Sequence, residues 1–163
     1  MNFDVGEVLV YPHHGAVTIT KIQTRTIKGV EKKYVTLNAH MSDLTIEIPV
    51  ESAELVGMRD VIDESGIDAV FDVLRSDYVD EAGNWSRRYK ANQEKMASGS
   101  VLRVSEVVRD LWRRDRDKGV SAAEKNMLVK SRQVLISELA LARHVSNDEA
   151  TVLLDEVLAT LAE

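Results

Sequence analysis

The sequence predicts an α+β protein, mainly β in its N-terminal part and all α in its C-terminal part. Two observations predict this class. Apolar and polar residues alternate in short runs before Gly57, whereas after it the apolar residues recur at three- and four-residue spacing. We therefore expect a small β-barrel over residues 1–57, followed by a helical bundle over residues 58–163.

The first part is expected to form four or five short strands. The alternating apolar positions are Val17 and Ile19, and then Leu44, Ile46 and Ile48, with Pro49 ending the second run. Alternation at a period of two means that one face of each strand is buried. Lys28-Gly29 marks one turn and the stretch PHHG, residues 12–15, marks another. Strands of this length need closure or packing to be stable.

The second part divides into four or five helices by their start and stop signals. An apolar stripe of Ile67, Val70, Phe71 and Leu74 predicts a first helix that ends before Asp77. A polar, acidic segment from Ser76 to Gly83 follows, and Asn84 is placed to cap the next helix. A third helix is expected from near Ser100 to Lys118, before Gly119. Ser121 and Glu124 form a capping box for a fourth, and a fifth begins at Asn147 or Asp148.

Composition excludes several classes of function. There is no cysteine, which removes disulfides and thiolate catalysis, and the histidines show no metal-binding spacing. His13 and His14 are adjacent near a strand and tend to point to opposite faces. No signal peptide or membrane span is recognisable. We expect a cytoplasmic binding protein and not an enzyme, with no cofactor, no metal and no membrane partner, acting as a monomer.

The net charge of −6 conceals a strong segregation. Residues 85–132 hold 13 basic and 6 acidic residues, a net charge of +7, while the three other parts of the chain are acidic. A basic block of this kind is typical of a surface that binds nucleic acid or another polyanion, although part of any such block can be a solvated face. The sequence favours polyanion binding here.

The two tryptophans have different surroundings. Trp112 follows Val108 by four residues in an apolar stripe and is expected in the core. Trp85 shares helical spacing with Tyr89 and could also be a core residue. It lies, however, in the first turn of its helix, where free N–H groups attract phosphate, and cations follow it directly. An aromatic in this setting suits stacking on a base or wedging into a groove.

Two further patterns leave their partners open. The segment Gly119–Lys125 between two helices is similar to the turn of a helix-turn-helix, which would make the fourth helix a major-groove reader. Its first turn, however, offers no Arg, Asn or Gln for base edges. On the expected hairpin, a cluster of lysines and Arg25 is opposed only by Glu31. This cluster suits either an acidic protein or nucleic acid.

Five motifs stand along the chain in this order: YPHHGA, TRTIKG, NWSRRYKAN, EVVRDLWRRD and SAAEK. In order and spacing they resemble the CarD family of bacterial transcription regulators in its actinobacterial form. The resemblance covers nearly the whole chain. It implies an N-terminal Tudor-like domain, similar to that of the transcription-repair coupling factor, which docks on the β subunit of RNA polymerase. It further implies a helical domain that contacts promoter DNA near the −10 element, at the upstream edge of the bubble.

The resemblance also assigns expected sites. Trp85 matches the family's minor-groove wedge, and the family's DNA-facing basic surface is matched by Arg87, Arg88, Lys90 and Lys125. Arg25 and Ile27 lie where the family's barrel meets the polymerase. Glu47 departs from the basic residue of relatives, which weakens the case for an ion pair with the polymerase there.

The implied function is global transcription regulation by a wedge, without sequence specificity, that stabilises the open promoter complex. In this reading the protein reaches the nucleoid through RNA polymerase. A sequence-specific helix-turn-helix repressor is the alternative, and a scaffold that binds only proteins is a third class.

Overall fold

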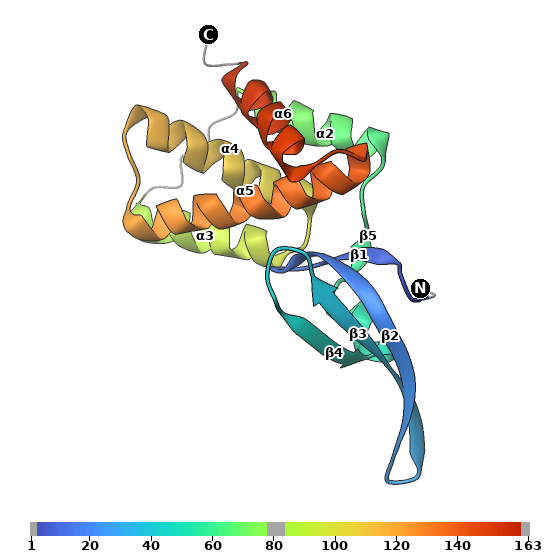
Figure 1. The fold of residues 1–163 in the computed structure, drawn as a ribbon. Helices are drawn as coiled ribbons and strands as arrows, with labels where there is room; N and C mark the ends of the chain where they lie inside the picture. The colour runs from blue at the N-terminus through green and yellow to red at the C-terminus, as the bar shows by residue number, and fades with distance from the viewer. Residues whose placement is uncertain (1–2, 78–83, 161–163) are drawn as a thin grey trace.

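The computed structural model describes residues 3–77 and 84–160 and confirms the α+β organisation. Figure 1 shows a sheet with a long projecting hairpin beneath a group of helices. The strands are β1 (Val8–Tyr11), β2 (Gly15–Ile27), β3 (Val30–Ala39), β4 (Thr45–Pro49) and β5 (Arg59–Asp60). The helices are α1 (Val50–Leu55), α2 (Glu64–Arg75), α3 (Trp85–Ala97), α4 (Val101–Asp117), α5 (Ala122–Arg143) and α6 (Asn147–Ala159).

The five strands form one antiparallel sheet in the order β4-β3-β2-β1-β5. Within it, β2 and β3 form the predicted hairpin. Lys28 and Gly29 have φ values of 52° and 79°, and Ile27 pairs with Val30. Two consecutive residues with positive φ in a two-residue loop match the twist of the strands that they join. The sheet order leaves β4 and β5 at the two edges.

The alternation of apolar residues predicts most of the sheet's buried face. Val17 and Ile19 are fully buried, and Ile46 and Ile48 pack against the same core. Leu44 was expected to continue this stripe, but it precedes β4 and is 41% exposed, so that expectation is wrong. The stripe fails there because the alternation holds only where the strand is paired, and β4 begins at Thr45.

Two short elements were not foreseen. Helix α1 follows Pro49 directly and inserts Ala53 into the core of the sheet. Strand β5 comes after Gly57 and pairs with β1, so the sheet includes residues beyond 57. Both elements are too short to show a periodic pattern in the sequence.

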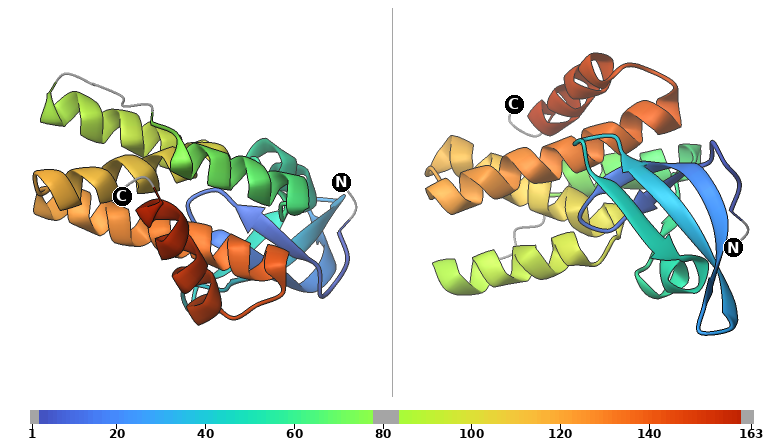
Figure 2. Two further views of the ribbon diagram at one scale, coloured as in Figure 1. Left: turned by 90° about the horizontal axis from the view of Figure 1, so that it is seen from above. Right: turned by 60° about the horizontal axis from the view of Figure 1, so that its bottom comes forward.

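The helical bundle has its own apolar core. The predicted stripe of α2 is buried, and α4 begins at the expected cap, Ser100. Helix α5 packs against both α4 and α6, and Figure 2 shows it lying along α4 with α6 on its other side. The capping box of Ser121 and Glu124 and the start of α6 at Asn147 are confirmed. Residues 78–83 of the expected acidic segment lie outside the described residues.

Candidate nucleic-acid and protein interfaces

Trp85 is an exposed residue at the N-terminus of α3. Asn84 caps this helix as predicted, because its Oδ1 accepts a hydrogen bond of 2.9 Å from the backbone N–H of Arg87. The side chain of Trp85 is 44% exposed, whereas Trp112 packs against the core of the bundle. The interpretation of Trp85 as a core residue is therefore wrong, and tryptophan is one of the residue types that are enriched at binding interfaces.

The indole of Trp85 is held in place on two sides. Its ring stacks on that of Tyr89, with the centroids 5.3 Å apart and the planes inclined by 9°. Its Nε1 donates a hydrogen bond of 3.0 Å to Oγ of Ser121, the residue that caps α5. An exposed ring that is already oriented loses little side-chain entropy when it meets a ligand.

Arg88 points into the bundle and pairs with a buried carboxylate. Its Nε and Nη2 donate to Glu124 at 2.8 and 3.3 Å, and the side chain of Glu124 is 1% exposed. Burial raises the pKa of Glu124, but the hydrogen bonds and charge of Arg88, with those of Ser121, outweigh burial and lower it. The charge of Arg88 is therefore neutralised within the protein and is not presented beside Trp85.

The other predicted DNA-facing cations lie at the surface. Arg87 and Lys90 are exposed on α3, and Lys125 is exposed in the first turn of α5. Within residues 3–77 and 84–160, none of these three forms an ion pair. Since Lys125 follows Glu124, it lies on the same turn of α5 that holds the indole and Arg88. The structure thus joins α3 and α5 into one surface around Trp85.

Much of the basic block, in contrast, has structural partners. Arg109 and Arg113 of α4 donate to carbonyl groups at the C-terminal end of α2, Arg109 to Val73 and Arg113 to Ser76. Burial and the neighbouring charge of Arg109 lower the pKa of Arg113. Further pairs in the block are Lys95 with Glu106, Arg116 with Asp117 and Arg132 with Asp155. The net charge of the block therefore overstates the charge that is available to a polyanion.

The expected polymerase-binding residues lie on the sheet. Arg25 of β2 and Glu47 of β4 form an ion pair across β3, and the guanidinium of Arg25 lies 5.0 Å from the ring centroid of Tyr34. Gln23 also donates to Glu47, at 3.4 Å. Ile27 is 51% exposed near the tip of the hairpin and does not join this group. Sequence reasoning missed Tyr34 because strand pairing, and not spacing along the chain, brings it beside Arg25.

The structure argues against a helix-turn-helix. A recognition helix needs a free N-terminal turn to enter the major groove. The first turn of α5 is instead contacted by α3, through the indole of Trp85 at Ser121 and the guanidinium of Arg88 at Glu124. The helix is also buried along much of its length.

Two of the histidines, His14 and His40, have local side-chain partners. His14 packs edge-on against Tyr11, and the ring of His40 is 2.6 Å from Oγ1 of Thr18. Burial lowers the pKa of both histidines. The described residues contain no group of three or more metal-binding side chains, and no helix among them is long and apolar enough to cross a membrane.

Comparison with known proteins divides the chain as the fold does. The CarD-like/TRCF RID domain family matches residues 3–62, and the CarD C-terminal domain family matches residues 69–155. The chain is 30% identical over 147 residues to a Bacillus subtilis (strain 168) protein named "Putative transcription factor YdeB", a match that spans 90% of this chain and 96% of that protein.

A solution NMR structure of the 72-residue N-terminal domain of Myxococcus xanthus CarD is also similar, at 22% identity. The match covers 36% of this chain and 79% of that one, with a TM-score of 0.31. The assignment rests on the two family matches and on the relative from Bacillus subtilis. The chain belongs to the CarD family of transcription regulators.

Proposed function

We propose that this protein docks on the β subunit of RNA polymerase through its sheet and stabilises the open promoter complex with Trp85. The observation that carries the proposal is the exposed indole of Trp85, which is oriented by Tyr89 and Ser121 and lies at a helix N-terminus beside Arg87 and Lys90. The ring can insert at the upstream edge of the bubble, in the minor groove near the −10 element, while the cations contact the backbone.

The energies restrict what the tryptophan can do. Unstacking a DNA step costs a few kcal/mol, and stacking an aromatic side chain on a base returns about 1–3 kcal/mol. Trp85 alone therefore does not melt a closed duplex. Where polymerase has already separated the strands, the same stacking favours the open state by about 5- to 150-fold. On this proposal the chain acts by binding alone, without catalysis, a cofactor or a metal.

Docking supplies the location that base readout does not. A basic surface binds DNA without specificity at a Kd of about 10⁻⁴ to 10⁻⁶ M, whereas a tethered module has an effective concentration near the millimolar range. The match to the CarD-like/TRCF RID domain supports polymerase as the tether. The edge strand β4 supplies unpaired backbone groups for a strand of the partner.

The pair of Arg25 and Glu47 lies beside this edge and changes what Arg25 can contribute. Each side chain is partly exposed, at 45% and 38%, so the pair can be reached by a partner, but its net charge is zero. We infer that docking here depends on strand pairing and on the exposed Ile27 more than on attraction of a single free cation.

The test of the wedge is the lifetime of the open complex. We expect Trp85→Ala to leave polymerase binding nearly unchanged and to shorten the lifetime, because the stacking surface is lost. Val152→Ala, which removes an exposed apolar side chain from α6, is the control and should keep the parent lifetime. A folded Trp85→Ala protein with the parent lifetime would contradict the wedge.

The test of docking is capture of the isolated β subunit. Arg25→Glu places two carboxylates together at Glu47 and should weaken capture. Lys118→Glu, a charge reversal of equal size at the end of α4, should not weaken it. Equal capture by Arg25→Glu and the parent would show that the sheet face is the wrong one. A footprint on naked DNA without polymerase would favour the repressor alternative instead.

A further inference from the structure

We propose that Arg59 and Glu138 form a latch between the sheet and the helical bundle, and that this latch sets the position of Trp85 relative to the polymerase-docking face. The inference rests on the proposed function for its consequence, but the latch itself is a property of the free protein. Arg59 lies in β5 and Glu138 lies within α5, 79 positions later in the chain.

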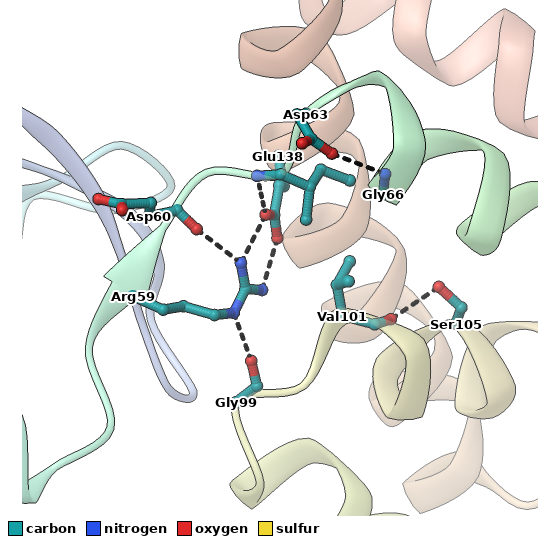
Figure 3. A network of polar contacts seen from close by, with 9 residues as sticks. Arg59, Asp60, Asp63, Gly66, Gly99, Val101, Ser105 and Glu138 are labelled. Carbon is teal, nitrogen blue, oxygen red and sulfur yellow. Dashed lines mark hydrogen bonds and ion pairs between the residues drawn. The ribbon is translucent and has the colours of Figure 1, made fainter.

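The contact is a fork-to-fork ion pair in a buried setting, and Figure 3 shows its geometry. Nη1 and Nη2 of Arg59 donate to Oε2 and Oε1 of Glu138, both at 2.7 Å, and Glu138 is 2% exposed. The backbone N–H of Ile62 donates to the same carboxylate at 3.0 Å. The paired hydrogen bonds fix the orientation of both planes, which a single point contact between charges does not do.

The remaining guanidinium nitrogen of Arg59, Nε, contacts the turn that follows α3, the helix that carries Trp85. This nitrogen donates to the backbone carbonyl of Gly99 at 2.8 Å, in the turn between α3 and α4 (Figure 3). One side chain thus connects the edge of the sheet to the C-terminal half of α5 and to the turn that follows α3. Trp85 lies at the opposite end of α3.

The backbone around the latch is closely packed. Gly99 has a φ of 73°, and a Cβ there would lie 2.9 Å from Cγ of Pro12 in the turn between β1 and β2. On the other side of that turn, a Cβ on Gly15 would lie 2.9 Å from Sδ of Met41. The stretch YPHHG is therefore seated between the sheet and the bundle, where it leaves little room for the two parts to slide.

Orientation, and not stability, is what this pair supplies. A buried ion pair contributes little net stability compared with apolar side chains of the same size, because desolvation offsets its attraction. Only three residues, 61–63, separate β5 from α2, so the chain itself limits the distance between the two parts but not their rotation. The latch removes that rotation.

Because α3 is long, a small rotation between the sheet and the bundle would produce a large displacement of Trp85 at its far end. Its 13 residues span about 20 Å at a rise of about 1.5 Å per residue. A rotation of about 10° at Gly99 would move Trp85 by about 3.5 Å, which is about one base step along a DNA strand. A wedge displaced by one step would meet a different base pair, even though docking and the tryptophan itself were intact.

The experiment measures the distance between the two parts and the lifetime of the open complex in the same variants. The chain has no cysteine, so Thr24→Cys on β2 and Glu94→Cys on α3 give two specific positions for spin labels. Glu138→Gln keeps the size of the side chain and removes its charge. Asp155→Asn is the control, because it makes the same kind of change in a more exposed ion pair, with Arg132, that joins two helices of the bundle and does not reach the sheet.

We expect one narrow distance distribution in the parent and the control, and a broad one in Glu138→Gln. In the unlabelled proteins, Glu138→Gln should keep the parent affinity for the β subunit and shorten the open-complex lifetime by about fivefold or more, the lower end of typical coupling between sites. Arg59→Lys keeps the charge without the fork, so it should also broaden the distribution, and it takes the place of Glu138→Gln if that variant does not fold.

Two results would overturn the inference. A distribution as narrow as that of the parent in both latch variants would show that Arg59 and Glu138 do not restrict the two parts. A broad distribution with the parent lifetime would show that their fixed orientation is not needed. A parent lifetime in Trp85→Ala would refute the wedge instead, while the distance measurement would still decide whether the latch exists.

Discussion

Replacing Glu124 with Gln removes a buried charge that links α3 to α5. Breaking a buried ion pair typically costs about 3–5 kcal/mol, because the remaining charge loses its partner. Arg88 retains 17% exposure and can turn partly toward water, so we expect the lower end, about 3 kcal/mol. That is a large share of the roughly 5–15 kcal/mol by which proteins of ordinary size are stable.

Urea unfolding followed by tryptophan fluorescence measures this loss. Both tryptophans lie in the helical part, so the signal reports on the bundle. With a urea dependence of about 2 kcal/mol per molar, the midpoint should fall by about 1.5 M. Asp117→Asn, which affects the exposed pair with Arg116, is the control and should leave the midpoint unchanged. A midpoint for Glu124→Gln equal to that of the parent would refute the assignment of Arg88 to a structural role.

The ion pair of Arg88 and Glu124 also predicts how the free energy of unfolding depends on pH, and the lowered pKa of Glu124 fixes the sign of that dependence. Its pKa is lowered in the folded state, so the carboxylate stabilises the fold fully above the unfolded pKa of about 4.3. This stabilisation is lost as the pH falls through the lower folded-state pKa. The difference in stability between the parent and Glu124→Gln should therefore be complete at neutral pH and disappear in acid. A difference that grows in acid would contradict this reasoning.

Three further predictions follow from the geometry. Ser121→Ala should free the indole of Trp85 and lower its fluorescence anisotropy, whereas Ser121→Thr should not; equal anisotropy in all three proteins would refute the hydrogen bond as a restraint. Gly99→Ala should lower the free energy of unfolding by about 1–3 kcal/mol because of backbone strain, and by more because the new Cβ would lie 2.9 Å from the β1–β2 turn. Gly119→Ala meets open space, so its free energy of unfolding should fall only by the amount due to backbone strain. Equal midpoints for the two glycine variants in urea would refute the close packing. Lys125→Ala should make the plot of log binding constant against log salt concentration shallower by about 0.7–0.9, the value for one lost phosphate contact. An unchanged slope would show that Lys125 does not contact DNA.

The sequence predicted the features that are encoded within a few neighbouring residues. Asn84 caps α3, Ser121 and Glu124 form a capping box, and Lys28-Gly29 turns the hairpin, because each signal needs side chains only a few positions apart. The class of fold followed from the two periodicities in the same way.

Contacts between distant residues could not be predicted. Arg88 and Glu124 are 36 positions apart, and Arg59 and Glu138 are 79 apart. The resemblance, together with the position of Arg88 beside Trp85, assigned Arg88 to the DNA-facing surface, because neither shows which cations meet carboxylates after folding. The sequence also left open whether Trp85 is a core or a surface residue, because its helical spacing with Tyr89 fits either position. Its exposure in the structure decides between the two.

The stack of Tyr89 on Trp85 gives the indole two unequal faces. A ring that intercalates between two base pairs needs both faces free, whereas a ring that caps the end of a base stack needs only one. Since Tyr89 already covers one face, the wedge that we propose would place Trp85 at the end of a base stack and not between two stacked base pairs. A fork, where paired DNA ends and a terminal base is uncovered, offers such an end. Under the proposed function, the same asymmetry would disfavour the interior of a closed duplex, so the stacking of two aromatic rings four residues apart would itself favour open DNA.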